Sequence, residues 1–323
     1  MKKTVNFSCW SLGAHARLNI LPAIKKISET NLVGAYTRNH RVLNEVASQY
    51  GCVSYESDQD LVEDIRVNAV YISSPTSEHY HQAKKALSSK KHVLIEKSAF
   101  ASIDQALEMV DLANSKQCYI FEAFMFRYHD QILALKNHIL EHAEDIISVV
   151  VRFGFPHFSD IENIRYKKDL AGGALNDAGA YCLAFFNELI GGKPRLVTGS
   201  LRIEPGFEVD TSGHALIEAE RGETAYMEWG FGRPYQNSAE IWTTGGMYLV
   251  ERAFSKPGDL SVSISKVINE KKYFIYEGSD NHFEKMLLHV SDLINQPFNP
   301  RINDAVVRQA RLVEQIRKES LKR

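Results

Sequence analysis

Val5–Ala16 reads VNFSCWSLGAHA, an apolar run followed by a turn and by the first residues of an amphipathic segment. This order predicts a strand over 5–9, a turn at 11–14 and a helix from Arg17 to Ser28. Pro22 falls inside that helix and is expected to kink it. A strand, a tight turn and a helix form the first half of a βα unit, so the turn is the first place to look for a ligand site.

The same alternation continues to residue 122. Further strands are expected over 32–36, 69–72, 92–95 and 118–122, and helices over 41–50, 58–64, 78–89 and 103–115. Strands separated by helices of this length form parallel sheets. Their near-continuous apolar character fits a sheet that is covered on both faces. Right-handed crossovers then predict a doubly wound, Rossmann-type α/β domain, which we place at residues 1–126.

The pattern changes after Arg127. Strands are expected over 146–151, 196–203, 214–219, 224–231, 239–243 and 247–252, and helices over 130–141, 174–189, 282–295 and 302–320. Gly and Pro turn signals separate the strands. Residues 127–323 therefore predict a second, α+β domain with a mostly antiparallel, open-faced sheet flanked by helices.

Composition excludes several classes of protein. The 323 residues include 38 Lys and Arg and 40 Asp and Glu, a net charge of −2, so no basic excess favours a nucleic acid or an anionic membrane. No run approaches the ~18 apolar residues of a membrane span. The four cysteines, Cys9, Cys52, Cys118 and Cys182, form no Cys-x-x-Cys pair and are expected to be free thiols in the cytoplasm.

The first turn partly matches the dinucleotide fingerprint G-x-G-x-x-G/A. Gly13 and Ala16 fit the second and third positions, where the backbone approaches the pyrophosphate and the helix packs on the strand. Ser11 replaces the first glycine, and Ala14 and His15 lie between the two matching residues. On this match alone, a plain βα turn without a ligand is an equal alternative.

The end of the second strand distinguishes between two nicotinamide cofactors. A carboxylate there would bind the ribose hydroxyls of NAD, but the chain has Thr37-Arg38. A hydroxyl beside a guanidinium suits the 2′-phosphate of NADP. The pair favours NADP, with NAD possible, over the alternative of a solvated arginine.

Four later segments resemble one family of oxidoreductases. They are SPTSEH at 74–79, KHVLIEKS at 91–98, EAFMFRYH at 122–129 and GGALNDAGAY at 172–181. In this order and on these elements they resemble the glucose–fructose oxidoreductase/inositol dehydrogenase (Gfo/Idh/MocA) family, which includes dihydrodiol dehydrogenases. Ser98 departs from the family pattern, which has proline after Glu96-Lys97.

The resemblance implies hydride transfer between a nicotinamide and a carbonyl or secondary alcohol of a sugar, a nucleotide-sugar or a related polyol. Lys97 would stabilise charge on the substrate oxygen, and Tyr181 stands where the family has a catalytic His or Tyr. Asp177 precedes Tyr181 by four residues and would share its helix face. The plain alternative for Tyr181 is a core tyrosine, because apolar residues surround it.

Other site residues are implied in the same way. Arg127 and Tyr166 are candidates for the substrate side, although each fits a packed polar residue equally well. The residues implied for the cofactor are Ser11, Gly13, Ala14, His15, Thr37, Arg38, Ser74, Pro75, His79, Glu96 and Lys97.

One segment raises the question of a metal. Residues 138–142 read HILEH, which matches the H-x-x-E-H pattern of a zinc peptidase family. No other feature supports a peptidase, so we expect a solvated helix face and no metal.

Two further functions remain open. A non-catalytic cofactor-binding sensor or regulatory protein of this fold is favoured by Ser11 and Ser98 and opposed by Lys97, Asp177 and Tyr181. A glycoside hydrolase of the family that uses NAD transiently is opposed by Thr37-Arg38.

The strand at 224–231 bears on assembly. Ala225, Met227, Trp229 and Phe231 share one face, and Thr224, Tyr226 and Glu228 share the other. Too few helices are expected to cover both faces of this sheet. We therefore expect a homodimer or homotetramer that assembles through it, as the family resemblance also implies.

Overall fold

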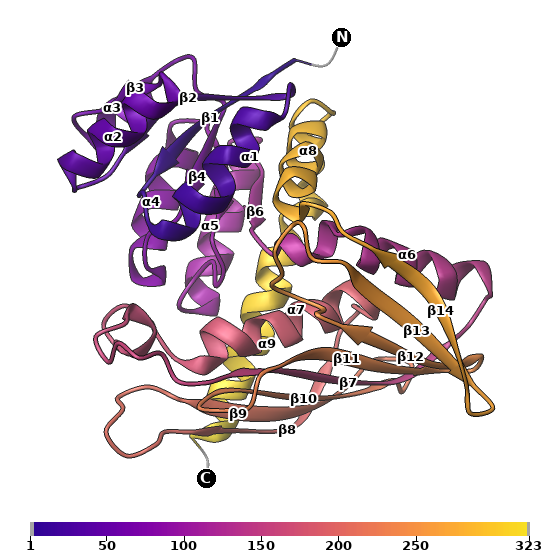
Figure 1. Cartoon of the computed structure of the whole chain (residues 1–323). Coiled ribbons are helices and arrows are strands. Elements are labelled where there is room, and N and C mark those ends of the chain that lie inside the picture. The colour runs from indigo at the N-terminus through magenta and orange to yellow at the C-terminus, as the bar shows by residue number, and fades with distance from the viewer. Residues whose placement is uncertain (1–2, 322–323) are drawn as a thin grey trace. The chain divides into compact units, whose positions relative to one another are not determined.

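The computed structural model describes residues 3–321, which fall into two compact units (Figure 1). Unit 1 holds the described residues up to Ala123 together with Phe283–Ala310. Unit 2 holds Phe124–His282 and the described residues from Arg311 onward. The domain limits expected from the sequence differ from these units, because they assign 283–310 to the second domain.

Unit 1 is built on a six-stranded sheet in the order β3-β2-β1-β4-β5-β6, and every pair in it is parallel. The strands are β1 (Val5–Trp10), β2 (Thr30–Tyr36), β3 (Val53–Ser54), β4 (Ala69–Ile72), β5 (His92–Ile95) and β6 (Ile120–Glu122). This order is that of a doubly wound dinucleotide-binding fold, so the expected fold class is confirmed. The two-residue strand β3 is too short to show in the sequence pattern.

Several helices of this unit begin after a residue whose side chain accepts a hydrogen bond from a free backbone N–H. The helices are α1 (Leu21–Lys26), α2 (His40–Tyr50), α3 (Asp58–Glu63), α4 (Thr76–Ser88), α5 (Ile103–Ser115) and α8 (His282–Ile294), whose first residue belongs to unit 2. Ser57 and Asp60 form a reciprocal capping box at α3. The helix expected over 17–28 is divided into a π-helical turn, Ala16–Ile20, and α1. Pro22 lies in the first turn of α1, where its missing N–H breaks no hydrogen bond.

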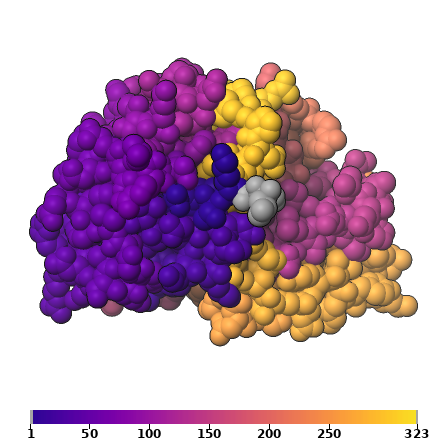
Figure 2. All heavy atoms as spheres, turned by 90° about the horizontal axis from the view of Figure 1, so that it is seen from above, coloured from indigo at the N-terminus to yellow at the C-terminus, as the bar shows by residue number. Residues whose placement is uncertain are grey.

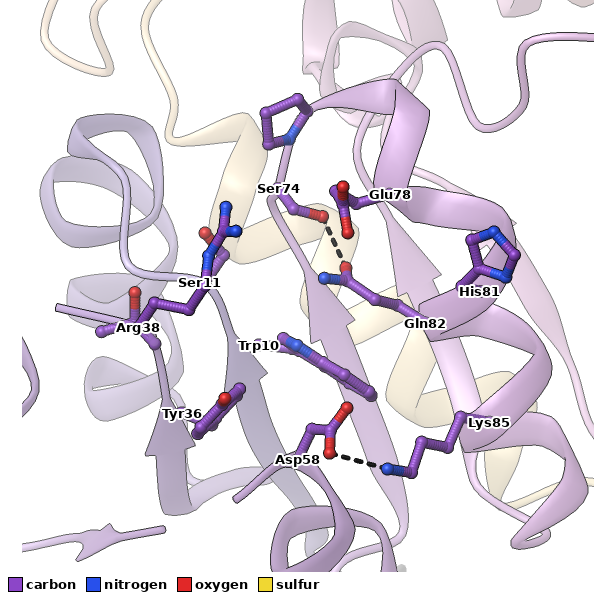
Figure 3. Close-up of a pocket in the computed structure, with 12 residues that line it drawn as sticks. Trp10, Ser11, Tyr36, Arg38, Asp58, Ser74, Glu78, His81, Gln82 and Lys85 are labelled. Atoms are coloured by element: carbon purple, nitrogen blue, oxygen red, sulfur yellow. Dashed lines mark hydrogen bonds and ion pairs between the residues drawn. The ribbon is translucent and has the colours of Figure 1, made fainter. Parts of the chain in front are cut away.

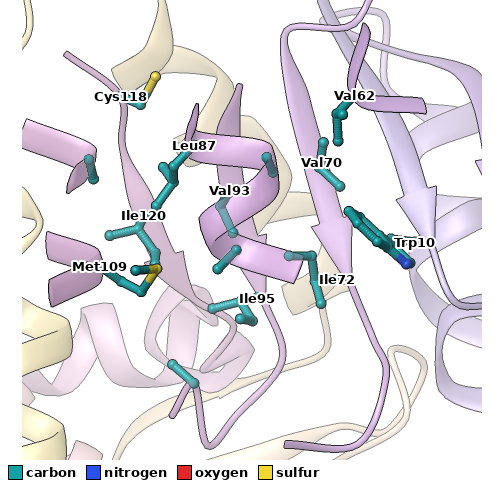
Figure 4. Packing of buried hydrophobic residues seen from close by; sticks show 14 of the residues in the cluster. Trp10, Val62, Val70, Ile72, Leu87, Val93, Ile95, Met109, Cys118 and Ile120 are labelled. Carbon is teal, nitrogen blue, oxygen red and sulfur yellow. The ribbon is translucent and has the colours of Figure 1, made fainter. Parts of the chain in front are cut away.

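A continuous apolar core fills one side of the sheet in unit 1 (Figure 4). Side chains of β4, β5 and β6, such as Val70, Val93 and Ile120, pack against Leu87 of α4 and Met109 of α5. The chain from β1 to β6 forms the indigo-to-purple mass of Figure 2. Burial of such strands on both faces explains their near-continuous apolar sequences.

The buried side chain of Asn303 connects the segment 283–310 to the rest of unit 1. Asn303 is fully buried, and its Oδ1 accepts a hydrogen bond from the Ile120 N–H at 2.9 Å. Its Nδ2 donates to the Cys118 carbonyl at 3.0 Å and to Asn114 Oδ1 at 2.8 Å. Val306 joins the apolar core directly after it. Asn303 and Val306 therefore belong to the same core as the first strand-helix units, although about 180 residues separate them from β6.

Unit 2 is built on an eight-stranded sheet in the order β14-β13-β12-β11-β7-β10-β9-β8. Its strands are β7 (Ile146–Phe155), β8 (Arg195–Arg202), β9 (Ser212–Glu218), β10 (Thr224–Phe231), β11 (Gln236–Thr243), β12 (Gly246–Glu251), β13 (Val262–Ile268) and β14 (Lys271–Gly278). Only the β7–β10 pair is parallel, which confirms a mostly antiparallel sheet. Strands β13 and β14 were not expected, because Lys266 occupies an inward position in β13 and β14 is an exposed, lysine-bearing edge strand.

Helices α6 (Asp130–Glu141) and α7 (Ala180–Leu189) lie on one side of this sheet, and the later residues of α9 (Asp304–Ser320) belong to the same unit (Figure 1). The inward residues of β10 expected from the sequence, Ala225, Met227, Trp229 and Phe231, are all buried. On the opposite face Tyr226 is exposed. The alternation in β10 therefore has the predicted sense.

A glycine in β2 provides a test of the packing in unit 1. A Cβ added to Gly34 would meet the ring of Tyr55 and lie 2.8 Å from the Val53 carbonyl oxygen. We expect Gly34→Ala to lower the free energy of unfolding by about 2 kcal/mol. Gly13→Ala is the matched control, because an added Cβ there meets nothing within 4 Å. Urea unfolding measures both variants, and equal stabilities would contradict this account of the packing.

Candidate active site

Three loops meet at the carboxyl edge of the sheet in unit 1. Ser11 follows β1, Thr37-Arg38 follows β2, and Ser74-Pro75 follows β4, and these three strands are neighbours. Together the loops line a cavity of about 270 Å³ (Figure 3). Ligands of doubly wound sheets bind at this position, where the strand order reverses between β1 and β4. The structure thus brings together five residues that the sequence assigned to the cofactor.

The rest of the cavity lining was not predicted. Trp10 and Tyr36 are the last residues of β1 and β2, and Asp58 begins α3. The remaining residues, Glu78, His81, Gln82 and Lys85, come from α4. Their spacing places them on one helix face, which is a signal that the sequence does contain.

Two basic side chains that line the cavity, Lys85 and Arg38, differ in their partners. Lys85 Nζ forms an ion pair with Asp58 Oδ1 at 2.7 Å. The Arg38 guanidinium has no ion-pair or hydrogen-bond partner within residues 3–321, and Figure 3 shows it extending toward Ser11. A guanidinium in this state is available to an anionic ligand.

One residue of the fingerprint turn has a backbone conformation that glycine adopts more readily than other residues. Ser11 adopts a φ of 76°, in the left-handed region. Its N–H donates to the Tyr36 carbonyl at 2.8 Å, and its own carbonyl accepts from Ser73 Oγ at 2.9 Å. The turn thus has a backbone conformation that favours glycine although a side chain is present. Gly13 and Ala14 are exposed beside it.

Glu96 and His15 form a second polar group near this edge. His15 Nε2 lies 3.4 Å from Glu96 Oε1, and the Tyr71 hydroxyl donates to the same oxygen at 2.7 Å. Burial alone would favour the neutral acid, but His15, Tyr71 and the charge of Lys97 together lower the pKa of Glu96. The carboxylate therefore stays ionised beside the fingerprint turn.

His79 lies between the loops that follow β4 and β5. It is fully buried, with Nε2 2.8 Å from the Ser74 carbonyl oxygen and Nδ1 3.1 Å from that of Ser98. Burial lowers the pKa of His79, which keeps it neutral. Lys97 is the second residue after β5 and is half-buried, and its peptide bond to Ser98 is cis. A neutral ring carries one N–H, so His79 donates either to the loop after β4 or to the loop that carries Lys97.

Asp177 and Tyr181 lie in unit 2, at the start of the helix that contains α7. Residues Leu175–Gly179 form a π-helical turn, an irregularity that is frequent at functional sites. Asp177 Oδ2 accepts a hydrogen bond from Arg165 Nε at 2.8 Å. Arg165 was not predicted, because it lies twelve residues upstream in an irregular loop where no periodicity connects the two positions.

Tyr181 is almost fully buried in an aromatic cluster. Its ring lies 5.3 Å from Phe153, 5.5 Å from Phe124 and 5.6 Å from Phe254. Its hydroxyl donates to Met125 Sδ at 3.6 Å. These contacts are those of a core tyrosine, which is the alternative to a catalytic role for Tyr181. They hold the ring in place and do not decide between the two roles.

The two candidates for the substrate side have partners of their own. Arg127 Nε donates to Glu188 Oε2 at 2.6 Å. Tyr166 is buried, and its hydroxyl accepts a hydrogen bond from the Phe158 N–H at 2.9 Å. Tyr166 therefore braces the loop at 156–168.

Asp210 supports the turn that carries Asp177. Its Oδ2 accepts from the Leu175 N–H and its carbonyl accepts from the Ala174 N–H, both at 2.7 Å. Burial raises the pKa of Asp210 to about 6, although these bonds and Arg317 oppose the shift. The sequence gave no sign of this role, because an aspartate 33 residues after Asp177 shows no spacing that links the two.

This shift predicts a pH-dependent stability. The folded protein binds the Asp210 proton more tightly than the unfolded chain does, so the contribution of Asp210 to stability falls as pH rises from about 4 to about 7. Asp210→Asn preserves an acceptor for Leu175 but does not titrate. The free energy of unfolding of the wild type, minus that of Asp210→Asn, should drop by roughly 2–3 kcal/mol over this range. Urea unfolding at several pH values measures it, and a constant difference would contradict the assignment.

Family models match both halves of the chain. A model described as an oxidoreductase family with an NAD-binding Rossmann fold matches residues 12–124. A model of the GFO/IDH/MocA C-terminal domain matches residues 143–249.

Individual relatives agree with this result. The chain is 29% identical over 261 residues to a dTDP-3,4-didehydro-2,6-dideoxy-alpha-D-glucose 3-reductase of Saccharopolyspora spinosa, covering 80% of this chain and 78% of that one. It is 30% identical over 240 residues to the enzyme of the same name from Streptomyces violaceoruber, covering 74% and 70%. The fold is similar to that of KijD10, a 3-ketoreductase from Actinomadura kijaniata solved with NADP and TDP-benzene, with a TM-score of 0.90, 24% identity and 98% of each chain covered. With both domain models matched in order and these relatives spanning most of its length, the chain belongs to the Gfo/Idh/MocA oxidoreductase family.

Proposed function

We propose that this protein is an NADP(H)-dependent oxidoreductase that acts on a carbonyl or secondary alcohol of a sugar, a nucleotide-sugar or a related polyol. The observation that carries the proposal is the unpaired Arg38 guanidinium beside Thr37, in a cavity at the end of β2. At this edge of a doubly wound sheet, the 2′-phosphate of NADP is the anion that such a group recognises.

The residues around the cavity fit the rest of the cofactor. Ser11, Gly13, Ala14 and His15 form the turn that would hold the pyrophosphate, and nothing lies within 4 Å of an added Cβ at Gly13. Ser74 and Pro75 would contact the cofactor from the opposite wall of the cavity. Bound NADPH would supply the hydride.

A nucleotide-linked keto-sugar is the substrate class we favour. Two relatives that are similar over most of this chain are named as 3-reductases of a dTDP-linked didehydro-dideoxyglucose, and KijD10 is a 3-ketoreductase solved with TDP-benzene. Reduction of a ring ketone is therefore the reaction to test first.

We assign three residues to the chemistry. The Lys97 ammonium would face the carbonyl oxygen and stabilise the negative charge that grows there. The Tyr181 hydroxyl would donate the proton that converts the alkoxide to the alcohol. Asp177, oriented by Arg165, would bind a substrate hydroxyl. We keep Arg127 and Tyr166 as candidates for the substrate side, with their primary role in holding α7 and the loop at 156–168.

A cytoplasmic location is part of the proposal. Its support is the free state of Cys9, Cys52, Cys118 and Cys182, which fits a reducing compartment. Among the helices of residues 3–321, none is long and apolar enough to cross a membrane.

We also propose assembly through the outer face of the sheet in unit 2. Strand register aligns Leu216, Tyr226 and Val150 across β9, β10 and β7, and Trp242 and Met247 across β11 and β12. Tyr226 and Trp242 are 37% and 53% exposed. This face also carries the Arg152–Glu228 ion pair, and the same face of a second copy would cover its apolar side chains in a two-fold arrangement.

The cofactor assignment predicts a preference for NADPH over NADH in binding calorimetry. Arg38→Ala should weaken NADPH binding by about 1.5–3 kcal/mol, the usual loss for a charged hydrogen bond, and leave NADH binding nearly unchanged. Arg41→Ala is the matched control, because Arg41 is exposed and pairs only with Glu45 in α2. Equal affinity of the wild type for the two cofactors would contradict the role of Arg38.

The chemical assignment predicts separate losses in turnover of a nucleotide-linked keto-sugar. Lys97→Met should slow the chemical step by about 10²–10⁴-fold while leaving most NADPH binding intact. Tyr181→Phe should slow it as well and remove one ionisation from the pH–rate profile. Tyr80→Phe on α4 is the control. Variants at Lys97 and Tyr181 that matched the wild type would refute the assignment.

The assembly proposal predicts a dimer or tetramer of the 36.6 kDa chain in light scattering at micromolar concentration. Tyr226→Glu should convert it to monomers, because the substitution places a buried charge in the interface. Ile65→Glu is the control, since Ile65 is an exposed apolar residue of unit 1. A wild-type mass of one chain would overturn the proposal.

A further inference from the structure

The later residues of α9 pack into unit 2 and bring an arginine to the turn that carries Asp177. Leu312 and Ile316 are almost fully buried. An added Cβ at Gly199 of β8 would lie 3.5 Å from the Ile316 side chain, so the helix lies directly on that strand. Arg317 follows Ile316 and is half-buried. The packing of α9 therefore fixes the point from which the Arg317 side chain extends.

Arg317 reaches the turn through Asn176, the residue that precedes Asp177. Its Nη2 donates to Asn176 Oδ1 at 2.5 Å, across 141 residues of sequence. The other end of the same amide, Nδ2, donates to the Ala171 carbonyl at 2.8 Å. A guanidinium only donates and a carbonyl only accepts, so the two partners together fix the orientation of the amide. Asn176 is buried, and its bond to Arg317 is strengthened by the charge of the donor.

The residues on either side of Asn176 are held by other segments of unit 2. The Leu175 N–H donates to Asp210, which precedes β9. The Asp177 carboxylate accepts from Arg165 in the loop that follows β7. The residue between them is the one that α9 holds. A π-helical turn is a local departure from the α-helix, so contacts from outside the helix contribute to its conformation.

Arg317 acts on this turn in a second way, through its charge. That charge is one of the factors that oppose the rise in the pKa of Asp210, the carboxyl that holds Leu175. A lysine at this position would keep the charge but would lack the planar fork of donors that an arginine presents. The hydrogen bond to Asn176 and the charge beside Asp210 can therefore be separated by substitution.

We propose that Arg317 is a positioning residue of the active site, which holds the turn through Asn176 so that the Asp177 carboxylate keeps the place from which it binds a substrate hydroxyl. The role of Asp177 in this statement rests on the proposed function, whereas the contact itself does not. Loss of the contact frees the Asn176 amide and lets the turn relax. A displacement of about 1 Å at a group that orients the substrate is enough to slow a reaction by up to about 10²-fold.

Hydrogen–deuterium exchange measured by mass spectrometry tests whether Arg317 holds the turn. Arg317→Met and Asn176→Ala break the same contact from opposite ends, and Asn176→Ala leaves the arginine charge beside Asp210, which guards against loss of the fold. In both variants, peptides that cover 174–181 should exchange at least about tenfold faster, and the strands of the sheet in unit 2 should exchange as in the wild type. Arg311→Met, at an exposed arginine of α9, is the control. Unchanged exchange of the turn in both variants would overturn the proposal.

A double-mutant cycle with NADPH and a nucleotide-linked keto-sugar tests whether the contact acts through Asp177. Arg317→Met should lower kcat/KM about tenfold in the wild-type background and less than about twofold in Asp177→Asn, which has no carboxylate left to position. Arg317→Lys, which keeps the charge and one donor, should recover part of the loss.

The cycle separates this proposal from the proposed function. If Asp177→Asn lowers kcat/KM and Arg317→Met causes the same further loss in both backgrounds, Arg317 does not act through Asp177, and only the positioning role is wrong. If Asp177→Asn turns over the substrate as the wild type does, the role of Asp177 is wrong, and this proposal is wrong with it.

Discussion

The parallel pairing of β1 with β2 on one side and β4 on the other is the constraint on which the candidate cofactor site depends. It brings the carboxyl ends of three strands to one edge and reverses the strand order there. Ser11, Arg38 and Ser74 are far apart in sequence, but each lies within two residues of the end of one of these strands and lines the same cavity. The positions of the cavity, of the Arg38 charge and of the fingerprint turn therefore depend on how β1 pairs with β2 and β4.

Both units hold their candidate residues at the start of a helix that opens with a π-helical turn. The turn at Ala16–Ile20 follows the fingerprint, and the turn at Leu175–Gly179 carries Asp177. In each case buried polar groups fix the turn from outside: Glu96 beside His15 in unit 1, and Asp210 beneath Leu175 in unit 2. Neighbouring segments therefore contact the candidate residues or the turns that carry them.

The sequence predicted what depends on local pattern. Five of the six strands of unit 1 and the inward residues of β10 follow from periodicity. Of the five cavity residues, Ser11 follows from the fingerprint, Thr37 and Arg38 from the end of a strand, and Ser74 and Pro75 from the family resemblance. What it missed depends on contacts between distant segments: Arg165 on Asp177, Asp210 on Leu175, and Asn303 on Ile120. Strands β13 and β14 were missed because Lys266, paired with Glu144, is a buried charge where alternation requires an apolar residue. The roles of Lys97, Asp177 and Tyr181 stay predictions.

The return of residues 283–310 to unit 1 has a consequence for synthesis on the ribosome. While the chain is shorter than about 300 residues, the Ile120 N–H and the Cys118 carbonyl lack Asn303, and the core lacks Val306. The N-terminal half is made first but reaches its final core only after the whole sheet of unit 2 has left the ribosome. Folding of this protein is thus not strictly vectorial, and a fragment ending at Ala123 has an incomplete core.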